Sequence, residues 1–570
     1  MEKPWLKSYE PQVPPTIQYP ERPVDANLTE SALKFPNATA TIFQDAKLTY
    51  AQLNQLADRF AAALQQLGVK KGDRVAIYLA NSPQYPIAYY GALRAGAIVV
   101  PFNPLYAAPE VEHQLQDSGA ETILAMSRFY PIVKKVRANT ALKRVIVTNI
   151  KEYFPPVLKL LFTVAKEKHE GDRQDISGDA NTYWLQDLLS KAPSKPTPVD
   201  VKPSDTAVFL YTGGTTGVPK GAELAHSSVM ANAVMCRHWI HDCQDATEVV
   251  LAAIPLYHSY GMTTCMNFGV YAAGAMLLIP NPRDLKALMQ SISKHHPTLF
   301  PGVPTMYVAV NNYAEISKYN VKSIRACISG AAGLPVEVQT KFQDLTGARL
   351  VEGYGLSEAS PVTHANPIYG NNKIGTIGLP WPDTEAKLMD LETGTKEMPL
   401  GEAGELVVRG PQVMKGYWNM PDETKQVLRD GWLYTGDIAK MDAEGYFQIV
   451  DRKKDMIIAG GFNIYPRDVE EVLYQHPKVR EAVVAGIPDP YRGETVKAYV
   501  ILKQGETATQ QEIIDFCKGK MAKYKVPTAV EFRAELPKTI VGKILRRLLV
   551  EEEKKKLKVP APLGMKAKGQ

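Results

Sequence analysis

The sequence has few cysteines, no long apolar run and no large excess of either charge. Five cysteines among 570 residues form a sparse, odd-numbered set, which excludes a disulfide framework and indicates a reducing compartment. No stretch of about 18 apolar residues occurs, so we expect no membrane-spanning helix. The first residues lack the apolar core of a secretory signal, and together these absences predict a cytoplasmic protein.

Charge and composition exclude two further classes of protein. Lys and Arg total 66 and Asp and Glu total 60, so the net charge is only +6, and an excess this small does not require a nucleic-acid partner. Apolar residues make up 45% and charged residues 22% of the chain, as in folded proteins and unlike disordered ones. We therefore expect a large core and no nucleic-acid partner.

Apolar periodicity predicts helices and strands in alternation. Thr49 has the position of an N-cap with Gln52 three residues on, which is the spacing of a capping box. Gly68 ends the apolar helical repeat that follows. Short apolar strands are expected at residues 75–79, 95–100 and 121–125. This alternation predicts an α/β fold with mostly parallel sheets.

Proline and charge mark the expected domain boundaries. Six prolines within residues 1–25 predict an extended arm, because proline fixes φ and removes a backbone donor. The charge run Asp451–Asp455 separates two apolar, strand-like segments and is expected to divide the chain. We predict a large N-terminal domain at 26–450 and a small C-terminal α/β domain at 456–560, followed by a frayed tail at 561–570.

The strongest chemical signal is the segment Tyr211–Gly221, which follows an apolar strand. Its glycines let the backbone approach an anion, its hydroxyl and N–H groups donate to phosphate oxygens, and its lysine adds a positive charge. A Gly/Thr run by itself could be a flexible turn, and the spacing is not that of a P-loop. With a strand before it and a lysine after it, we interpret the segment as a phosphate-binding loop that uses Thr212, Gly213, Gly214, Thr215, Thr216, Gly217 and Lys220.

Four further motifs follow this loop in order. They are Tyr354–Glu358, Gly431–Asp437, Asp451–Arg452 with Lys454, and Pro537–Lys543. Together the five motifs resemble those of the acyl-adenylate-forming superfamily, which includes acyl-CoA synthetases, luciferases and peptide-synthetase adenylation domains. Two N-terminal segments, 71–76 and 102–106, are similar to bacterial long-chain fatty acid–CoA ligases in particular. The resemblance covers nearly the whole chain and implies a large body of stacked sheets and helices with a small mobile lid.

The resemblance implies a two-step reaction with ATP, Mg²⁺ and CoA. A carboxylate attacks the α-phosphate of ATP to give acyl-AMP and pyrophosphate, and the CoA thiol then displaces AMP. Glu358 is expected to hold Mg²⁺ on the phosphates, because Mg²⁺ takes hard oxygen ligands and few carboxylates. Lys543 follows the loop glycine as the superfamily lysine does, and it is expected to bridge the carboxylate and the α-phosphate. Lys538 and Arg546 are the nearby alternatives.

Further roles on the nucleotide are implied by the same motifs. Ser357 stands where threonine is commoner and keeps the hydroxyl group. Asp437 is expected to accept hydrogen bonds from both ribose hydroxyls, with Arg452 supporting the ribose or the phosphates. The adenine pocket is expected to consist of Gly330, Ala331, Ala332, Gly353, Tyr354 and Gly355, with the tyrosine stacked on the base. A small-residue turn such as 330–332 also occurs without a ligand.

The resemblance also implies that the small domain moves between the two half-reactions. Lys454 is the expected pivot, and Gly460 and Gly461 would line a narrow tunnel for the pantetheine arm, where only glycine leaves space. His258 lies in a segment that resembles the one facing the acyl carboxylate, so it would contact the carboxylate or gate the site. The alternative is a core histidine with satisfied hydrogen bonds.

Cys236, His238, His241 and Cys243 have the appearance of a metal cluster. On one continuous helix, however, the cysteines lie about 20° apart and the histidines about 60° apart, with the two pairs on opposite faces. They could not converge on one tetrahedral zinc ion unless the helix broke there. We therefore predict no metal at this position.

The apolar segment 154–165 lies outside the motifs. Its polar stripe is predicted to consist of Lys159, Thr163, Lys166 and Glu170, with apolar residues around the rest of a helix. One interpretation is that this helix packs against the large domain. The other is that the apolar arc enters a membrane interface while nearby lysines meet anionic headgroups, at the inner face of the membrane.

We therefore predict ATP-dependent ligation of a long-chain fatty acid to CoA. Ligases for medium-chain or aryl acids and enzymes that load a carrier protein share every motif. A catalytically silent acyl- or nucleotide-binding protein fits less well with intact Lys220, Glu358, Asp437 and Lys543. The sequence leaves open the preferred chain length, the oligomeric state, for which a homodimer is one option, and the degradative or biosynthetic direction.

Overall fold

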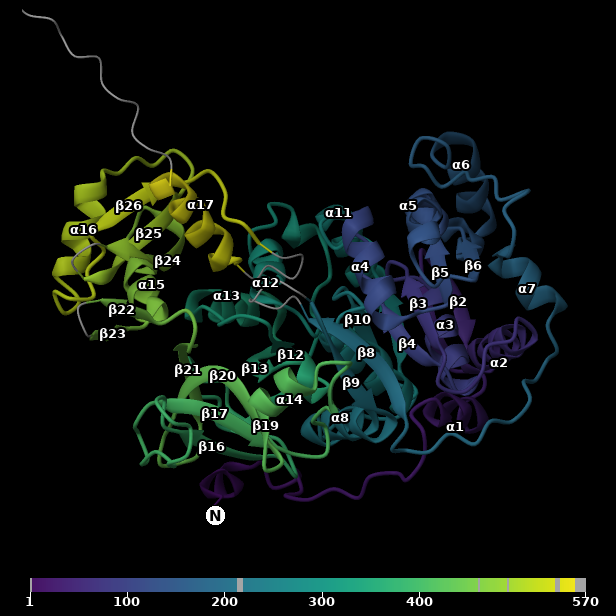
Figure 1. The fold of residues 1–570 in the computed structure, drawn as a ribbon, viewed down its shortest axis with the longest axis horizontal. Coiled ribbons are helices and arrows are strands. Elements are labelled where there is room, and N and C mark those ends of the chain that lie inside the picture. The colour runs from purple at the N-terminus through teal and green to yellow at the C-terminus, as the bar shows by residue number, and fades with distance from the viewer. Residues whose placement is uncertain (1–2, 213–218, 460–461, 490–491, 539–543, 559–570) are drawn as a thin grey trace, which may run out of the picture. The chain divides into compact units, whose positions relative to one another are not determined.

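The computed structural model describes residues 3–212, 219–459, 462–489, 492–538 and 544–558. The chain forms two compact units (Figure 1). The large unit comprises residues 1–386, 408–434 and 444–446, and the small unit comprises 387–407, 435–443 and 447–570. Lys543 and the glycines at 213, 214, 217, 460 and 461 lie outside the described residues, as do Thr215 and Thr216.

An eight-stranded sheet carries the phosphate-loop strands in the large unit. Its order is β18-β9-β8-β4-β3-β5-β6-β7, and the strands from β8 to β7 pair in parallel. This confirms the predicted parallel α/β arrangement for this sheet, whereas the sheet of the small unit is mainly antiparallel. The strands are β3 (Arg74–Tyr78), β4 (Ile98–Pro101), β5 (Thr122–Met126), β6 (Arg144–Thr148), β7 (Thr182–Trp184), β8 (Thr206–Thr212), β9 (Lys220–Ala225) and β18 (Gly416–Tyr417).

Helix α2 (Tyr50–Gln66) begins where the sequence predicts. Gln52 N–H donates to Thr49 Oγ1 at 3.2 Å, and Thr49 N–H donates to Gln52 Oε1 at 2.8 Å, so the capping box is present. Gly68 has φ +83° just beyond the helix, in the left-handed region that favours glycine. Other helices of this unit are α1 (Ala26–Lys34), α3 (Gln84–Arg94), α4 (Ala108–Ser118), α5 (Tyr130–Val136), α6 (Pro156–Ala165), α7 (Leu185–Lys191) and α8 (His226–Trp239).

Two four-stranded sheets complete the core of the large unit. One has the order β10-β11-β1-β2 and the other β12-β13-β14-β15; their buried side chains pack with those of α11, α12 and α13. The strands are β1 (Thr39–Phe43), β2 (Ala46–Thr49), β10 (Val249–Ala252), β11 (Ala275–Leu278), β12 (Ala326–Ser329), β13 (Arg349–Gly355), β14 (Val362–Ala365) and β15 (Leu379–Pro380). The helices are α9 (Ser259–Gly261), a buried π-helix at Met262–Asn267, α10 (Phe268–Tyr271), α11 (Leu285–His295), α12 (Pro304–Asn311), α13 (Val336–Thr346) and α14 (Pro421–Val427).

The small unit has its own sheet and core, as predicted for a C-terminal α/β domain. The order is β23-β22-β25-β24, with β26 paired to β25, and Val469, Leu473 and Ile513 pack onto it from the helices. Its elements are β22 (Ile457–Ala459), β23 (Phe462–Ile464), α15 (Pro466–Tyr474), β24 (Val479–Asp489), β25 (Gly493–Leu502), α16 (Gln510–Lys518), β26 (Ala529–Phe532) and α17 (Arg546–Lys558). A further sheet joins β16 (Glu385–Met389), β17 (Gly404–Arg409), β19 (Leu428–Arg429), β20 (Trp432–Met441) and β21 (Phe447–Arg452).

The structure corrects one prediction about the first residues of the chain. Residues Pro4–Ser8 form a short 3₁₀ helix, so the expectation of an arm without helix is wrong there. Proline suits this place because a first helical turn needs neither its N–H nor another φ, and Trp5 is buried at 1% exposure.

All five cysteines are buried and free. Of the helices in the described part of the chain, none is both long and apolar enough to cross a bilayer.

Candidate active site

The predicted phosphate loop connects two paired strands. β8 and β9 run antiparallel with Thr212 opposite Lys220, so the structure brings these two predicted residues together at the mouth of the loop. A Cβ atom at Gly221 would lie 3.2 Å from the ring of Tyr211, and glycine therefore lets the ring cover the start of β9. The five predicted residues from Gly213 to Gly217 lie outside the described part.

Lys220 and Glu358 are linked through a tyrosine that the sequence analysis missed. Tyr417, on β18, donates its hydroxyl to Glu358 Oε1 at 2.7 Å. The Lys220 ammonium lies over the Tyr417 ring, 5.3 Å from its centroid. Burial and the facing Glu358 carboxylate raise the pKa of Tyr417 well above its usual value, so the phenol stays a donor. The predicted cation and the predicted metal ligand thus share one aromatic neighbour.

Glu423 is a second residue that the sequence analysis missed. It lies in the first turn of α14 and forms an ion pair with Lys220. No local signal in the sequence indicates that Glu423, or Tyr417 six residues before it, meets a lysine about 200 positions earlier. The pairing of β18 with β9, with Tyr417 opposite Ala222, brings them there.

The residue types fit a magnesium ion that arrives with a triphosphate. In the described residues, no three carboxylate, histidine or cysteine side chains converge as a complete metal cage. Mg²⁺ is commonly held by one or two carboxylates together with substrate phosphates and water. Glu358 would supply one such carboxylate beside Ser357, whose hydroxyl lies 3.3 Å from that of Ser259.

Tyr354 lies on β13 between the two glycines of its motif, and its ring meets His364 edge-on with centroids 6.0 Å apart. The structure gives these glycines a reason other than room for a base. A Cβ atom at Gly355 would lie 2.1 Å from the carbonyl oxygen of Pro361, and one at Gly353 would lie 2.7 Å from Ile328. Close packing of neighbouring backbone and side chains therefore requires both glycines.

The 330–332 turn directly follows β12. Gly330 is buried against Tyr260, where an added Cβ would lie 3.1 Å from the ring. Ala331 has φ +69°, which is uncommon for a residue with a Cβ atom. Ala331 and Ala332 are exposed. Residues in this region of φ cluster at ligand-binding sites and also occur in ordinary turns, so the adenine role of this turn stays a prediction.

His258 caps the short helix α9. Its Nδ1 accepts a hydrogen bond from Tyr260 N–H at 3.3 Å, and the side chain is half-buried. The neighbouring Ser259 lies against Ser357, which places the predicted acyl segment beside the Tyr354–Glu358 motif. His258 therefore has a local structural role and also a position next to the predicted site.

The small unit brings Asp437 and Arg452 together. They face each other on β20 and β21, and Arg452 Nε lies 3.2 Å from Asp437 Oδ1. Asp437 is buried at 6% exposure. Partial desolvation and the neighbouring charge of Arg452 lower the pKa of Lys454, the predicted pivot, to about 8.

The two alternatives to Lys543 are already engaged in ion pairs. Arg546 donates to Asp455 at 2.8 Å and to Glu470 at 2.7 Å, and Lys538 pairs with Glu481. Arg546 thus ties the predicted hinge run to α15 within the small unit. This arrangement gives Arg546 a structural role.

Cys236, His238, His241 and Cys243 form no metal-binding group in the part of the chain that the structure describes, but the helix argument does not account for this. α8 ends at Trp239, so the assumption of one continuous helix through Cys243 is wrong. His241 instead lies with its Nε2 atom 2.6 Å from the Glu10 carboxylate. Cys236 and Cys243 are buried thiols whose pKa is raised by burial.

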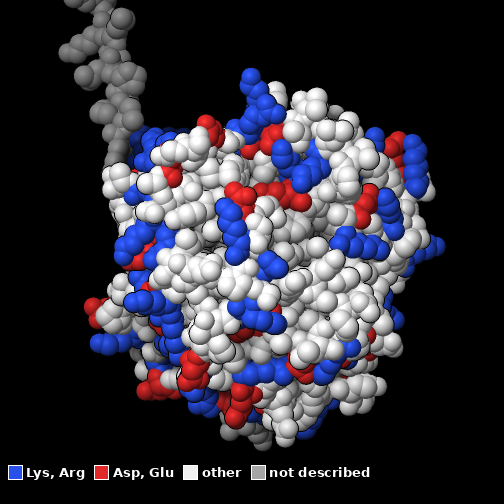
Figure 2. All heavy atoms as spheres, turned by 90° about the vertical axis from the view of Figure 1, so that its right-hand side faces the viewer, with Lys and Arg blue, Asp and Glu red and all other residues white. Residues whose placement is uncertain are grey.

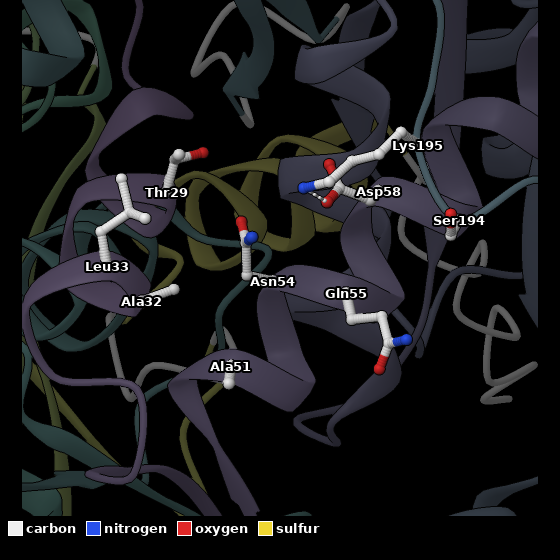
Figure 3. Close-up of a pocket in the computed structure, with 9 residues that line it drawn as sticks. All are labelled: Thr29, Ala32, Leu33, Ala51, Asn54, Gln55, Asp58, Ser194 and Lys195. Carbon is white, nitrogen blue, oxygen red and sulfur yellow. Dashed lines mark hydrogen bonds and ion pairs between the residues drawn. The ribbon is translucent and has the colours of Figure 1, made fainter.

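A cavity of about 300 Å³ lies elsewhere in the large unit, between α1, α2 and residues 194–195 (Figure 3). None of the predicted site residues lines it. Its charges are mutually paired, since Lys195 contacts Asp58 at 2.6 Å and Asp58 contacts Arg94 at 2.7 Å. Figure 3 shows the Lys195–Asp58 pair at the cavity wall. This cavity lies between helices and is not part of the candidate site.

Comparison with known proteins identifies the family. The AMP-binding enzyme model matches residues 28–418, and the AMP-binding enzyme C-terminal domain model matches residues 468–543. The chain therefore belongs to the AMP-binding enzyme family, as the sequence motifs predict.

The similarity extends over nearly the whole chain. A long-chain-fatty-acid–CoA ligase of Bacillus subtilis is 48% identical over 97% of this chain and 98% of its own. One of Escherichia coli O6:H1 is 41% identical over 98% of this chain and 99% of its own. The crystal structure of an anthranilate CoA ligase with anthranoyl-AMP has a TM-score of 0.83 and 28% identity, covering 95% of this chain and 98% of that one. The α/β fold and the enzyme class predicted from the sequence are thereby confirmed.

Proposed function

We propose that this protein is an AMP-forming ligase that joins long-chain fatty acids to CoA. The observation that carries the proposal is the 48% identity to a long-chain-fatty-acid–CoA ligase across 97% of the chain. The residues that the chemistry needs, Lys220, Glu358, Asp437 and Lys543, are all present. The proposed substrates are ATP, CoA and a fatty acid.

In the first half-reaction two anions must meet, so positive charge has to be placed beforehand. Lys220 would neutralise the terminal phosphates, and Lys543 would bridge the fatty carboxylate and the α-phosphate. Glu358 would hold Mg²⁺, which when bound neutralises phosphate charge. Tyr354 and the 330–332 turn would receive adenine, and Asp437 with Arg452 would bind the ribose. His258 would contact or gate the carboxylate; it has no base role, since a fatty acid is ionised near neutral pH.

In the second half-reaction the lid would turn about Lys454. We propose residues 451–455 as the hinge between the domains at 26–450 and 456–560, with Gly460 and Gly461 beside the pantetheine arm of CoA. The Arg546 ion pairs to Asp455 and Glu470 support this assignment, because they make the end of the hinge run part of the lid.

Measurement of AMP release across acids from acetate to oleate, with benzoate and coumarate included, tests the substrate class. The expected result is CoA-dependent turnover that is maximal at about twelve carbons or longer. A maximum with aryl acids would overturn the long-chain assignment and would fit the anthranilate ligase similarity. Pyrophosphate release without CoA turnover would indicate a carrier protein as acceptor, and no turnover with any acid would indicate a silent binding protein.

We further propose that α6 is a peripheral membrane contact of a cytoplasmic enzyme. Val157, Leu160, Leu161 and Val164 are 60–82% exposed, so the interpretation that the whole apolar arc packs inward is wrong. At about 100° per residue these four side chains fall within an arc of about 100°. Phe162 alone in this helix is buried, against Phe154. α6 lies at the periphery of the large unit (Figure 1).

The charges around α6 favour an anionic surface as its partner. Lys159, Lys166 and Lys168 are exposed, and uncharged surface bordered by Lys and Arg occurs on this side of the molecule (Figure 2). The acids of the following turn are engaged internally, since Glu167 pairs with Lys151 and Glu170 with Arg128. The helix ends at Ala165, so Glu170 does not extend the polar stripe as predicted. Each lysine would contribute about 1 kcal/mol near an anionic bilayer.

Flotation with vesicles of phosphatidylcholine, with and without phosphatidylglycerol, tests this contact. Burying each exposed Leu or Val stabilises membrane binding by about 1.5 kcal/mol or more. Leu161→Glu should therefore lower the partition coefficient onto the vesicles, measured by flotation, at least tenfold. Leu33→Glu is the matched control, because Leu33 is 77% exposed on α1 and outside the patch. Equal behaviour of the two variants, or no flotation of the wild type at any salt concentration, would refute the contact.

A further inference from the structure

The ion pair between Lys220 and Glu423 sits where the triphosphate of the proposed function would bind. Lys220 is the first residue of β9, and its side chain is only 18% exposed. The carboxylate of Glu423 is 40% exposed and satisfies this ammonium within the protein. A loop lysine needed for phosphate therefore already has an anionic partner.

Contacts between α14 and β18 hold Glu423 in position, in addition to its ion pair with Lys220. Thr424 Oγ1 accepts from Tyr417 N–H at 2.8 Å, and Thr424 also donates to Met420 O at 2.9 Å. A Cβ atom at Gly416 would lie 2.8 Å from Thr424, so α14 packs tightly on β18. Because β18 pairs with β9, these contacts hold Glu423 beside Lys220.

Tyr417 fixes the ammonium from a second direction. Its ring lies below Lys220 while its hydroxyl donates to Glu358. An ammonium that leaves Glu423 for a phosphate oxygen therefore keeps its cation–π neighbour. Exchange of one anionic partner for another needs only a small movement of the flexible lysine end.

We propose that Glu423 is an internal counter-ion that competes with nucleotide phosphates for Lys220. This inference rests on the proposed function, in which Lys220 binds phosphate. In the nucleotide-free enzyme Glu423 neutralises Lys220, and on ATP binding the triphosphate displaces it. After adenylation Glu423 recaptures Lys220 and so assists the departure of pyrophosphate. Glu423 is thus a positioning residue that lowers the affinity for the triphosphate and speeds the release of pyrophosphate.

Glu423→Gln keeps the shape of the side chain and removes its charge. We expect the affinity for inorganic pyrophosphate and for MgATP to rise roughly two- to fivefold, as for a partly exposed ion pair. Pyrophosphate should become a correspondingly stronger product inhibitor, and KM for ATP should fall without an equal rise in kcat. The difference from wild type should shrink as salt increases, because screening weakens the competition.

Asp422→Asn is the matched control, since Asp422 is the adjacent acid, is 91% exposed and lies 3.9 Å from Lys425. It makes the same change in net charge without touching Lys220. Titration calorimetry of the full chain with pyrophosphate alone, and steady-state kinetics, would be compared for both variants, with melting temperatures as a check of folding. In Lys220→Met the effect of Glu423→Gln should disappear, as a double-mutant cycle requires.

Two failures are distinguishable by this design. If wild type turns over fatty acid but Glu423→Gln matches Asp422→Asn, or if Glu423→Gln raises KM for ATP and lowers kcat together, the counter-ion inference is wrong and the proposed function stands. If wild type neither binds pyrophosphate nor releases AMP with any acid, the proposed function itself fails.

Discussion

Tyr417→Phe removes one oxygen atom and tests how Glu358 is held. The Tyr417 hydroxyl donates to Glu358 Oε1 at 2.7 Å. Hydrogen bonds to charged groups contribute about 1.5–3 kcal/mol, but Glu358 is only half-buried and water can replace part of the bond. We therefore take about 1 kcal/mol as the cost of losing the orientation of this carboxylate, which corresponds to roughly a fivefold weaker hold on Mg²⁺.

The assay is the dependence of fatty acyl-CoA formation on free Mg²⁺ at saturating fatty acid and CoA. We expect the Mg²⁺ concentration at half-maximal rate to rise roughly fivefold in Tyr417→Phe. The ring remains in place, so the cation–π contact with Lys220 persists. The melting temperature should therefore change by only a few degrees. The prediction thus separates orientation of the carboxylate from general loss of structure.

Tyr19→Phe is the control for this prediction. Tyr19 also donates to a carboxylate, Asp383 Oδ2, at 2.8 Å, in a part of the chain outside the candidate site. It should change stability without changing the Mg²⁺ dependence. If Tyr417→Phe leaves the Mg²⁺ dependence within twofold of wild type, or if Tyr19→Phe shifts it equally, the argument that Tyr417 orients a metal ligand is wrong.

Two further predictions concern catalysis and acid stability. Lys543→Ala should abolish formation of acyl-AMP and spare thioester formation from supplied acyl-AMP, measured as separate half-reactions; equal loss of both would contradict its role as the adenylation lysine. Burial lowers the pKa of His226 to about 4, so the folded state binds fewer protons than the unfolded state between about pH 4 and 6.5, and stability is lost as pH falls through this window, by up to about 3 kcal/mol. His226→Asn keeps an acceptor for Val24 N–H, which donates to His226 Nδ1 at 3.2 Å, and removes the titration. Its melting temperature should therefore fall less than that of wild type between pH 7 and 5, and parallel falls would count against this assignment.

Glu358 and its neighbours show why only part of the candidate site could be predicted from the sequence. The motif Tyr354–Glu358 is contiguous, so its residue types and spacing indicate a nucleotide site without coordinates. Tyr417 and Glu423 carry no motif of that kind, because each acts through a partner that is distant in the chain. The pairing of β18 with β9 decides their role, and strand pairing at such sequence separation leaves no periodic signal.

Three expectations failed because helix ends and burial depend on the tertiary structure. The polar stripe through Glu170 assumed a helix that continues, yet α6 ends at Ala165. The apolar arc was equally consistent with packing and with exposure, since periodicity identifies an apolar face and not what covers it. The Cys236–Cys243 cluster likewise assumed one helix, whereas α8 ends at Trp239.

Elements and chemistry that depend on neighbouring residues could be predicted without coordinates. The capping box at Thr49, the alternation of strands and helices, and the ordered motifs from Tyr211 to Lys543 are local in the chain, where propensity and residue type act directly. The pairs of distant charges that meet, such as Lys220 with Glu423 and Arg546 with Asp455, follow from the folded structure, as does the exposure of the apolar face of α6. These depend on long-range packing, in which the free energy of each contact is set by the whole fold.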